Sequence, residues 1–343
     1  MLAFGEVQTG LLQHSAAMSR RSVRAVLAFG PDDVVHSIER PIARSVSADR
    51  LEGVDCKLPS TTGRQTRGIG TVVSRAVVVG GHVAQGSAFA YTAKARKSRR
   101  HPSWSHYLAS PGQIEAIGKL DDKDVENGVL TGLHQAEAVE MQAIAGRMLD
   151  LVQRSRSLDN LPPVLAQRTR LRWTAELDKD ISTISATFTL VSDELRTVRL
   201  RVPDDDLEAV VTLCGDLALH DWLLSTVTAH LTSALAFSRD PEIRSARLRP
   251  IVEHLLHLWM PAAHVPDHLV PIWAALDRRP GFTPQWAATT TRIRDQIALA
   301  GLAHRQPPAS SNGHAEQRGL SQPTRTGTAG DMGNRRAPSG QMR

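Results

Sequence analysis

Between residues 164 and 202, apolar and polar residues alternate along three segments. A period of two is typical of strands with one buried and one exposed face. On the first segment Leu171, Trp173 and Leu177 point to one side, and we predict an antiparallel three-strand meander. Its opposite face is predicted to carry arginines on the flanking strands around a row of hydroxyl side chains. This predicted interaction face comprises Arg168, Arg170, Arg172, Thr183, Ser185, Thr187, Thr189, Arg199 and Arg201.

From Leu207 onward the apolar residues recur every three or four positions, which is the spacing of helices with one buried face. This stretch, up to about Ala303, contains four of the six tryptophans, and tryptophan buries a large area when it packs. The acidic residues 204–206 precede Leu207, where they suit a helix start. We therefore predict a C-terminal helical bundle.

The first 110 residues are predicted to be mainly extended. Residues 70–79 and 82–92 are rich in apolar and β-branched residues and flank Gly80 and Gly81, which is typical of a hairpin. A short helix is expected near residues 19–29 and a longer one over 133–154. The acidic run at 121–126 is expected to be a connector.

These elements predict an α+β fold, with a β-rich N-terminal region, the meander and the helical bundle. We expect a β-rich region over residues 1–120, an acidic connector and helix over 121–163, the meander plus bundle over 164–303, and a tail over 304–343. The tail has six arginines against two acidic residues and few large apolar residues. Such a composition predicts a disordered basic tail.

Charge and cysteine content narrow the classes of protein only slightly. The formal charge is +6, and because the tail accounts for +4 of it, the rest of the chain is nearly neutral. Two distant cysteines, Cys56 and Cys214, indicate neither a disulfide scaffold nor a thiolate zinc site. No export signal or membrane span is recognised, so we expect a cytoplasmic protein.

No complete catalytic set is present in the sequence. Asp216 and His220 lie four residues apart on the first bundle helix, followed by Asp221, and such a trio can serve general acid and base chemistry. More often such a trio is a buried network that fixes the helix register, or part of a partner-binding face. Cys56, beside Asp55 and Lys57, is a second weak candidate, as a nucleophile or as a small buried residue.

The sequence predicts no cofactor and no metal site. His254 and His257 share a helix face and could ligate a metal, but the HExxH order is missing. Five basic residues between Lys94 and Arg100 are expected to form a charged loop. With the arginines of the interaction face and the basic tail, they leave salt-dependent nucleic-acid binding open as an alternative function.

Several runs carry a resemblance to a known family, namely FGEVQTGLLQ, GVDCKLP, RGIGTVVSRAVVVGGHVAQGSA, SWSHYLA, GDLALHDWLLSTV, HLLHLWMPAAHV and RIRDQIALA. In these runs the chain resembles an uncharacterised actinobacterial family of the streptomycete type. The resemblance implies a gene neighbourhood that also encodes a variant P-loop protein and a methyltransferase-like protein. It implies no activity and no active-site residues.

The function expected from these observations is a non-enzymatic, protein-binding component of an actinobacterial multi-protein system. The neighbouring P-loop or methyltransferase-like proteins are the expected partners. An enzyme that uses Asp216, His220 and Asp221 is the alternative, and a nucleic-acid binder is the second alternative.

Overall fold

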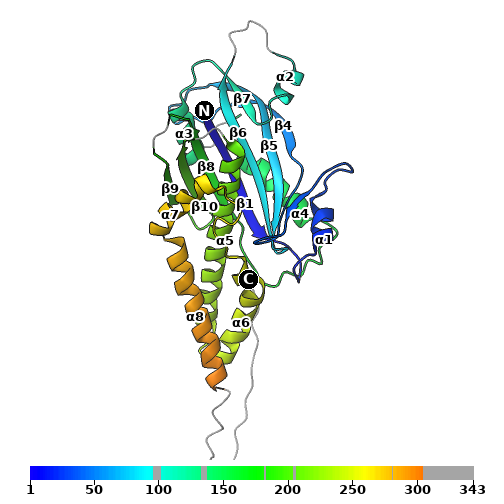
Figure 1. Ribbon diagram of the computed structural model, residues 1–343, viewed down its shortest axis with the longest axis vertical. Helices are drawn as coiled ribbons and strands as arrows, with labels where there is room; N and C mark the ends of the chain where they lie inside the picture. The colour runs from blue at the N-terminus through cyan, green and yellow to red at the C-terminus, as the bar shows by residue number, and fades with distance from the viewer. Residues whose placement is uncertain (96–101, 133–136, 181–182, 204–205, 280, 304–343) are drawn as a thin grey trace, which may run out of the picture. The chain divides into compact units, whose positions relative to one another are not determined.

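Ten strands form one mixed β-sheet in the computed structural model, which describes residues 1–95, 102–132, 137–180, 183–203, 206–279 and 281–303 (Figure 1). The strand order is β2-β3-β5-β7-β6-β1-β8-β10-β9, and β4 pairs with β5 outside this path. The strands are β1 (Leu2–Leu11), β2 (His36–Ile38), β3 (Arg44–Val46), β4 (Arg50–Lys57), β5 (Arg67–Val79), β6 (Val83–Lys94), β7 (Gln113–Ile117), β8 (Thr169–Leu177), β9 (Ser185–Leu190) and β10 (Leu195–Val202).

Helices cover both faces of this sheet, and the α+β class is confirmed. The helices are α1 (Arg20–Leu27), α2 (Trp104–Leu108), α3 (Asp122–Thr131), α4 (Met141–Gln153), α5 (Leu207–Phe237), α6 (Pro241–His254), α7 (Val270–Arg278) and α8 (Phe282–Ala303). Short 3₁₀ turns occupy Leu256–Leu258 and Asp267–Leu269. Residues 1–303 form one compact unit.

The predicted hairpin is confirmed as β5 and β6. Gly80 and Gly81 form its turn with φ of 58° and 68°, in the left-handed region that glycine adopts without a steric penalty. The two strands pair from Val79 and Val83 as far as Val73 and Phe89 and then diverge. Strand β7 lies between the separated ends, antiparallel to β5 and parallel to β6.

The three predicted strands of the meander are present, but their arrangement differs from the prediction. Strand β9 pairs antiparallel with β10, as expected. Strand β10 pairs in parallel with β8, so β9 is an edge strand and not the central one. The sequence prediction was wrong here because alternation specifies the face that a side chain takes, not the neighbour of its strand.

The regions predicted over 1–120 and 164–303 share the same sheet. Strand β1 lies between β6 and β8, antiparallel to both, so residues from the two regions pair directly. The acidic run at 121–126 is not a connector. It begins α3, with the side chain of Asp121 accepting a hydrogen bond from the backbone N of Asp124, because acidic residues are favourable at a helix N-terminus.

Four further sequence predictions concern two helices, the basic segment and the tail. The helix predicted over 19–29 is confirmed as α1, and the one predicted over 133–154 begins at Met141. Residues 133–136 lie outside the described residues, as do residues 96–101 of the basic segment. The tail from 304 also lies outside them.

The two largest hydrophobic clusters form cores on opposite faces of the sheet, and a third cluster involves α1 and α4. Helix α5 packs on one face against Val7 of β1 and Trp173 of β8, and α6 and α8 pack against α5. Helices α3 and α4 cover the other face, where Phe4 of β1 packs with Val129 and Ile144. Residues of β1 therefore contribute to both cores in alternation.

Candidate functional site

The arginines predicted to form an open interaction face are paired with carboxylates of this chain. Arg172 Nε lies 3.0 Å from Glu6 Oε2, because β1 and β8 place these two residues opposite each other on the same face. Arg170 Nη1 lies 3.8 Å from Glu6 Oε1. Arg201 Nε lies 2.8 Å from Glu176 Oε2 on the neighbouring strand. These cations are therefore largely neutralised within the fold.

Helices α3 and α4 supply the other partners of this face. Arg199 Nε lies 3.1 Å from Glu126 Oε1 of α3, and Arg199 also donates to the side chain of Asn127 at 2.7 Å. Arg168 Nη1 lies 2.7 Å from Asp150 Oδ1 of α4. The predicted arrangement, with arginines around a central hydroxyl row, is wrong, since the hydroxyl row lies on the edge strand β9.

Strand β9 presents that hydroxyl row to solvent. Ser185, Thr187 and Thr189 are exposed, together with Thr183 just before the strand. On its other face, Ala186 and Phe188 pack against the core, and the Phe188 ring meets Phe282 edge to face at 5.1 Å. The core therefore holds β9 in place, while no described strand pairs with its second edge.

A cavity of about 430 Å³ lies between the sheet and helices α3 and α4. Side chains from the centre of the sheet contribute to its lining, including Glu6 and Gln8 of β1 and Arg172 of β8. Gln8 Nε2 donates to the backbone O of Gln142 at 2.8 Å, which ties β1 to α4. The sequence analysis did not identify this cavity. The sequence feature that could have indicated it is Glu6, a charged residue within the largely apolar strand β1.

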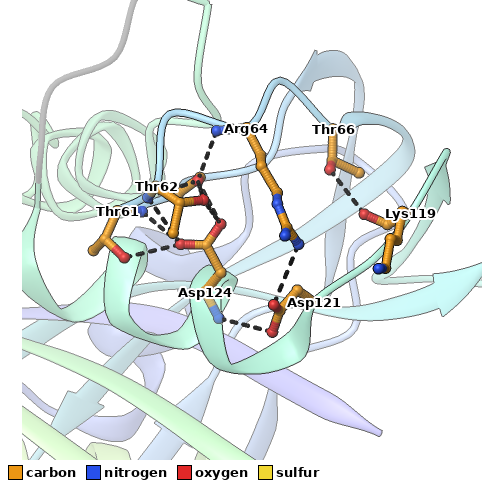
Figure 2. A network of polar contacts seen from close by, with 8 residues as sticks. Thr61, Thr62, Arg64, Thr66, Lys119, Asp121 and Asp124 are labelled. Atoms are coloured by element: carbon orange, nitrogen blue, oxygen red, sulfur yellow. Dashed lines mark hydrogen bonds and ion pairs between the residues drawn. The ribbon is translucent and has the colours of Figure 1, made fainter.

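Helix α3, which lines part of this cavity, is held by the polar contacts that Figure 2 shows. Asp124 of α3 accepts hydrogen bonds from the side chains of Ser60 at 2.5 Å, Thr61 at 2.8 Å and Thr62 at 2.7 Å. It also accepts from the backbone N of Thr61 and of Thr62. Burial raises the pKa of Asp124, but these hydrogen bonds outweigh it and hold the pKa well below its ordinary value. Segment 60–62 is thereby fixed to α3.

The catalytic candidates Asp216 and His220 lie together, with His220 Nδ1 3.5 Å from Asp216 Oδ2, and both also bind backbone groups. His220 Nδ1 donates to the backbone O of Asp216 at 2.8 Å, and its Nε2 accepts from the backbone N of Met260 at 3.2 Å. The carboxylate of Asp216, whose pKa is raised by burial, accepts from the backbone N of Ala262 at 2.8 Å. Both side chains therefore tie the segment after the first 3₁₀ turn to α5.

Asp221, the third member of the predicted trio, has a different partner. Its Oδ2 lies 2.5 Å from Nε of Arg196 on β10, and both side chains are buried. Burial raises the pKa of Asp221 to about 6, against the lowering effect of Arg196. The trio is therefore divided between two networks, one of Asp216 with His220 and one of Asp221 with Arg196.

Cys56 lies on β4, beside β5, and its thiol contacts the backbone O of Gly68 at 3.7 Å. Burial and the neighbouring Asp55 raise the pKa of the Cys56 thiol to about 11. This is the opposite of what activates a nucleophilic cysteine.

We expect Cys56 in the folded protein to react with iodoacetamide at pH 8 about a hundredfold more slowly than an unperturbed thiol, because only the thiolate reacts. Intact mass against time gives this rate, and the denatured protein serves as the control. Labelling of the folded protein at the rate of the denatured protein would show instead that the thiol is accessible and activated.

The histidines singled out in the sequence lie close to one that was not. His254 and His257 place their rings 5.0 Å and 6.1 Å from the ring of His82, which follows the hairpin turn. Burial, with a contribution from His254, lowers the pKa of His82 to about 4. In the part of the chain that the structure describes, no group of three or more His, Cys, Asp or Glu side chains is arranged to hold a metal ion.

One described helix, α5, is long and apolar enough to cross a membrane by length and composition alone. However, 78% of its apolar window is buried within the protein, as expected for a core helix. Comparison of the chain with protein-family models, with curated proteins and with solved structures finds no match.

Proposed function

We propose that this protein is a non-enzymatic binding component that captures a partner protein by adding one of the partner's strands to the edge of β9. The observation that carries this proposal is that no described strand pairs with the second edge of β9, although helix α7 contacts this strand. An exposed edge presents unpaired backbone N–H and C=O groups, which are a template for a further strand. Strand addition is a recurring mode of peptide recognition.

The composition of β9 supports this proposal. Residues 185–191 contain no charged residue and no proline, and Leu190 and Val191 are 62% and 56% exposed. Natural proteins normally protect an edge with charges, prolines or a very short strand. Strand β9 has six residues and none of these devices.

The other edges of the same sheet are protected. Strand β2 has three residues, and Glu39, Arg40 and Pro41 follow it closely. Strand β4 carries four charged residues among its eight, namely Arg50, Glu52, Asp55 and Lys57. Because the other edges are protected and β9 is not, we infer that the unprotected edge of β9 serves binding.

The proposed partner is a different protein with an extended segment. The P-loop and methyltransferase-like proteins implied by the resemblance are the first to test. Backbone pairing would supply affinity, and the hydroxyl row at Ser185, Thr187 and Thr189 would contribute specificity through alternate side chains. A nucleic-acid surface is less well supported, because Arg168, Arg172 and Arg199 are paired within the chain.

The first experiment places a photocrosslinking amino acid at Thr189 and, as a matched control, at the exposed Arg21 of α1. The full chain is coexpressed with each of the two expected partners and irradiated. We expect a discrete heterodimeric product from position 189 and none from position 21. In the uncrosslinked protein, Thr189→Lys should weaken binding of the same partner at least tenfold, because a charge is introduced at the edge.

A product formed by two copies of this chain would contradict capture of a different protein, as would equal crosslinking from positions 189 and 21. Binding that Thr189→Lys leaves unchanged would place the partner elsewhere on the surface. Circular dichroism of each variant verifies that the fold is retained.

A further inference from the structure

We propose that the cavity between β1, β8 and helices α3 and α4 binds a small neutral ligand with an N–H donor beside a carbonyl acceptor, as on the lactam edge of a nucleobase. This site is separate from the β9 edge and does not depend on it. Three features carry the inference: an unfilled buried acceptor, an unfilled donor next to it, and a cavity of metabolite size.

The acceptor is Oε1 of Glu6. Glu6 is fully buried at the centre of the sheet and lines the cavity. Its Oε2 lies 3.0 Å from Nε of Arg172, but Oε1 has no hydrogen-bond donor among the described residues and lies 3.8 Å from Arg170 Nη1. Buried polar atoms in native proteins normally have a partner, so an orphaned carboxylate oxygen in a cavity indicates a place for a ligand's donor.

The donor belongs to Arg172, which lines the same cavity. Its Nε bonds to Glu6 and its Nη1 donates to the backbone O of Val129 at 3.2 Å, whereas no described residue accepts from Nη2. A guanidinium has five N–H donors. Glu6 and Arg172 therefore offer an acceptor and a donor side by side, which complements a group with N–H next to C=O.

The local charge selects for a neutral ligand. Glu6 has two arginines within 4 Å, Arg170 and Arg172, so one carboxylate faces two cations. The lining also includes Glu140, Arg147 and Asp150, of which Arg147 pairs with Glu52 and Asp150 pairs with Arg168. A ligand cation would be repelled by Arg170 and Arg172, and a ligand carboxylate would compete with Glu6 for Arg172. A neutral amide-like edge satisfies both unfilled atoms without adding charge.

The walls and size of the cavity suit a flat, partly apolar body. Apolar side chains line it from the sheet and from both helices, including Phe4, Val129 and Met141. Its volume of about 430 Å³ lies within the range of small-molecule sites. Gly132, the left-handed end of α3 with φ of 65°, leaves room for the Arg172 guanidinium, which a Cβ atom there would overlap.

The test uses inosine as the probe and 1-methylinosine as its matched control, because the added methyl removes the N–H donor and leaves the rest of the molecule unchanged. Calorimetry with the full chain is expected to show saturable binding of inosine and at least tenfold weaker binding of 1-methylinosine. An absence of saturable inosine binding, or equal binding of both nucleosides, would overturn the proposal.

Two variants locate the binding. Ala143→Trp introduces a bulky side chain at an exposed, cavity-lining position of α4, and Ala288→Trp makes the same change at an exposed position of α8. We expect at least tenfold weaker inosine binding for Ala143→Trp and unchanged binding for Ala288→Trp. In a folded Glu6→Gln variant, the affinities for inosine and 1-methylinosine should differ by less than they do in the wild type. Unchanged inosine affinity in Ala143→Trp would overturn the assignment to this cavity.

Discussion

Replacing Arg196 by Met is expected to lower the free energy of unfolding by about 3 to 5 kcal/mol at pH 8, because it leaves the buried carboxylate of Asp221 without its cation. Both side chains are buried, and Arg196 also donates to the side chain of Ser225 at 2.8 Å and to the backbone O of Ser192 at 3.0 Å. Arg196 thus joins α5 to the turn between β9 and β10. Urea unfolding monitored by circular dichroism measures the loss.

The loss of unfolding free energy in Arg196→Met should increase with pH. Burial already raises the pKa of Asp221 to about 6, and removal of the cation that lowers it will raise the pKa further. A carboxyl with a raised pKa in the folded state contributes its full stability below its unfolded pKa and loses it as the pH rises through the folded value. The deficit should therefore be smallest near pH 4 and grow above pH 6.

The matched control is the double variant Arg196→Met with Asp221→Leu, which removes both charges. Replacing a buried ion pair by apolar residues is often close to neutral, so much of the lost stability should return and the additional pH dependence should disappear. A deficit of equal size at pH 4 and pH 8, or a double variant as unstable as Arg196→Met, would show that the buried charge is not the cause.

Gly86→Ala is expected to be the second most damaging of these changes, at about 3 kcal/mol. Gly86 lies on β6 where α4 packs directly on the sheet, and a Cβ atom there would lie 2.6 Å from the backbone N of Leu149 and closer still to the backbone O of Ala145. Neither backbone atom can move without displacing α4. Because α4 also forms a wall of the cavity, inosine binding should weaken in the same variant. Thermal and urea unfolding measure the effect.

Gly215→Ala is the control for Gly86→Ala, with the same substitution and the opposite expected sign. Gly215 is inside α5, and a Cβ atom there would contact only Gln85 Oε1, at 3.7 Å. Alanine is favoured over glycine within a helix by about 1 kcal/mol, so this variant should be more stable than the wild type. Destabilisation by both substitutions would mean that the close approach of α4 to Gly86 is not the cause.

Local features of the fold were predictable from the sequence, and long-range pairing was not. The paired glycines at 80 and 81 specify a hairpin turn, and Ser19 marks the start of α1 with a side chain that accepts from the backbone N of Ser22. By contrast, β8 pairs in parallel with β10, and not with β9, the next strand along the chain. Alternation along a single strand contains no information on that choice.

The candidate site was predictable only in part for the same reason. The alternation correctly placed Thr187 and Thr189 on an exposed face, and the open edge of β9 emerged only from the strand order. The arginines were expected to be free because their carboxylate partners come from distant segments, as with Glu6 for Arg172 and Glu126 for Arg199. Such ion pairs can be identified only when the positions of β1 and α3 in the fold are known.

The central position of β1 also constrains how the chain reaches this structure during synthesis. Its two neighbours, β6 and β8, are encoded far downstream, and β8 begins about 160 residues after β1 ends. At translation rates of about 5 to 20 residues per second, the apolar first strand waits roughly 10 to 30 s for its second neighbour. Until β8 has been synthesised, β1 can pair only with β6, so the contacts between β1 and β8 are among the late steps of folding during synthesis.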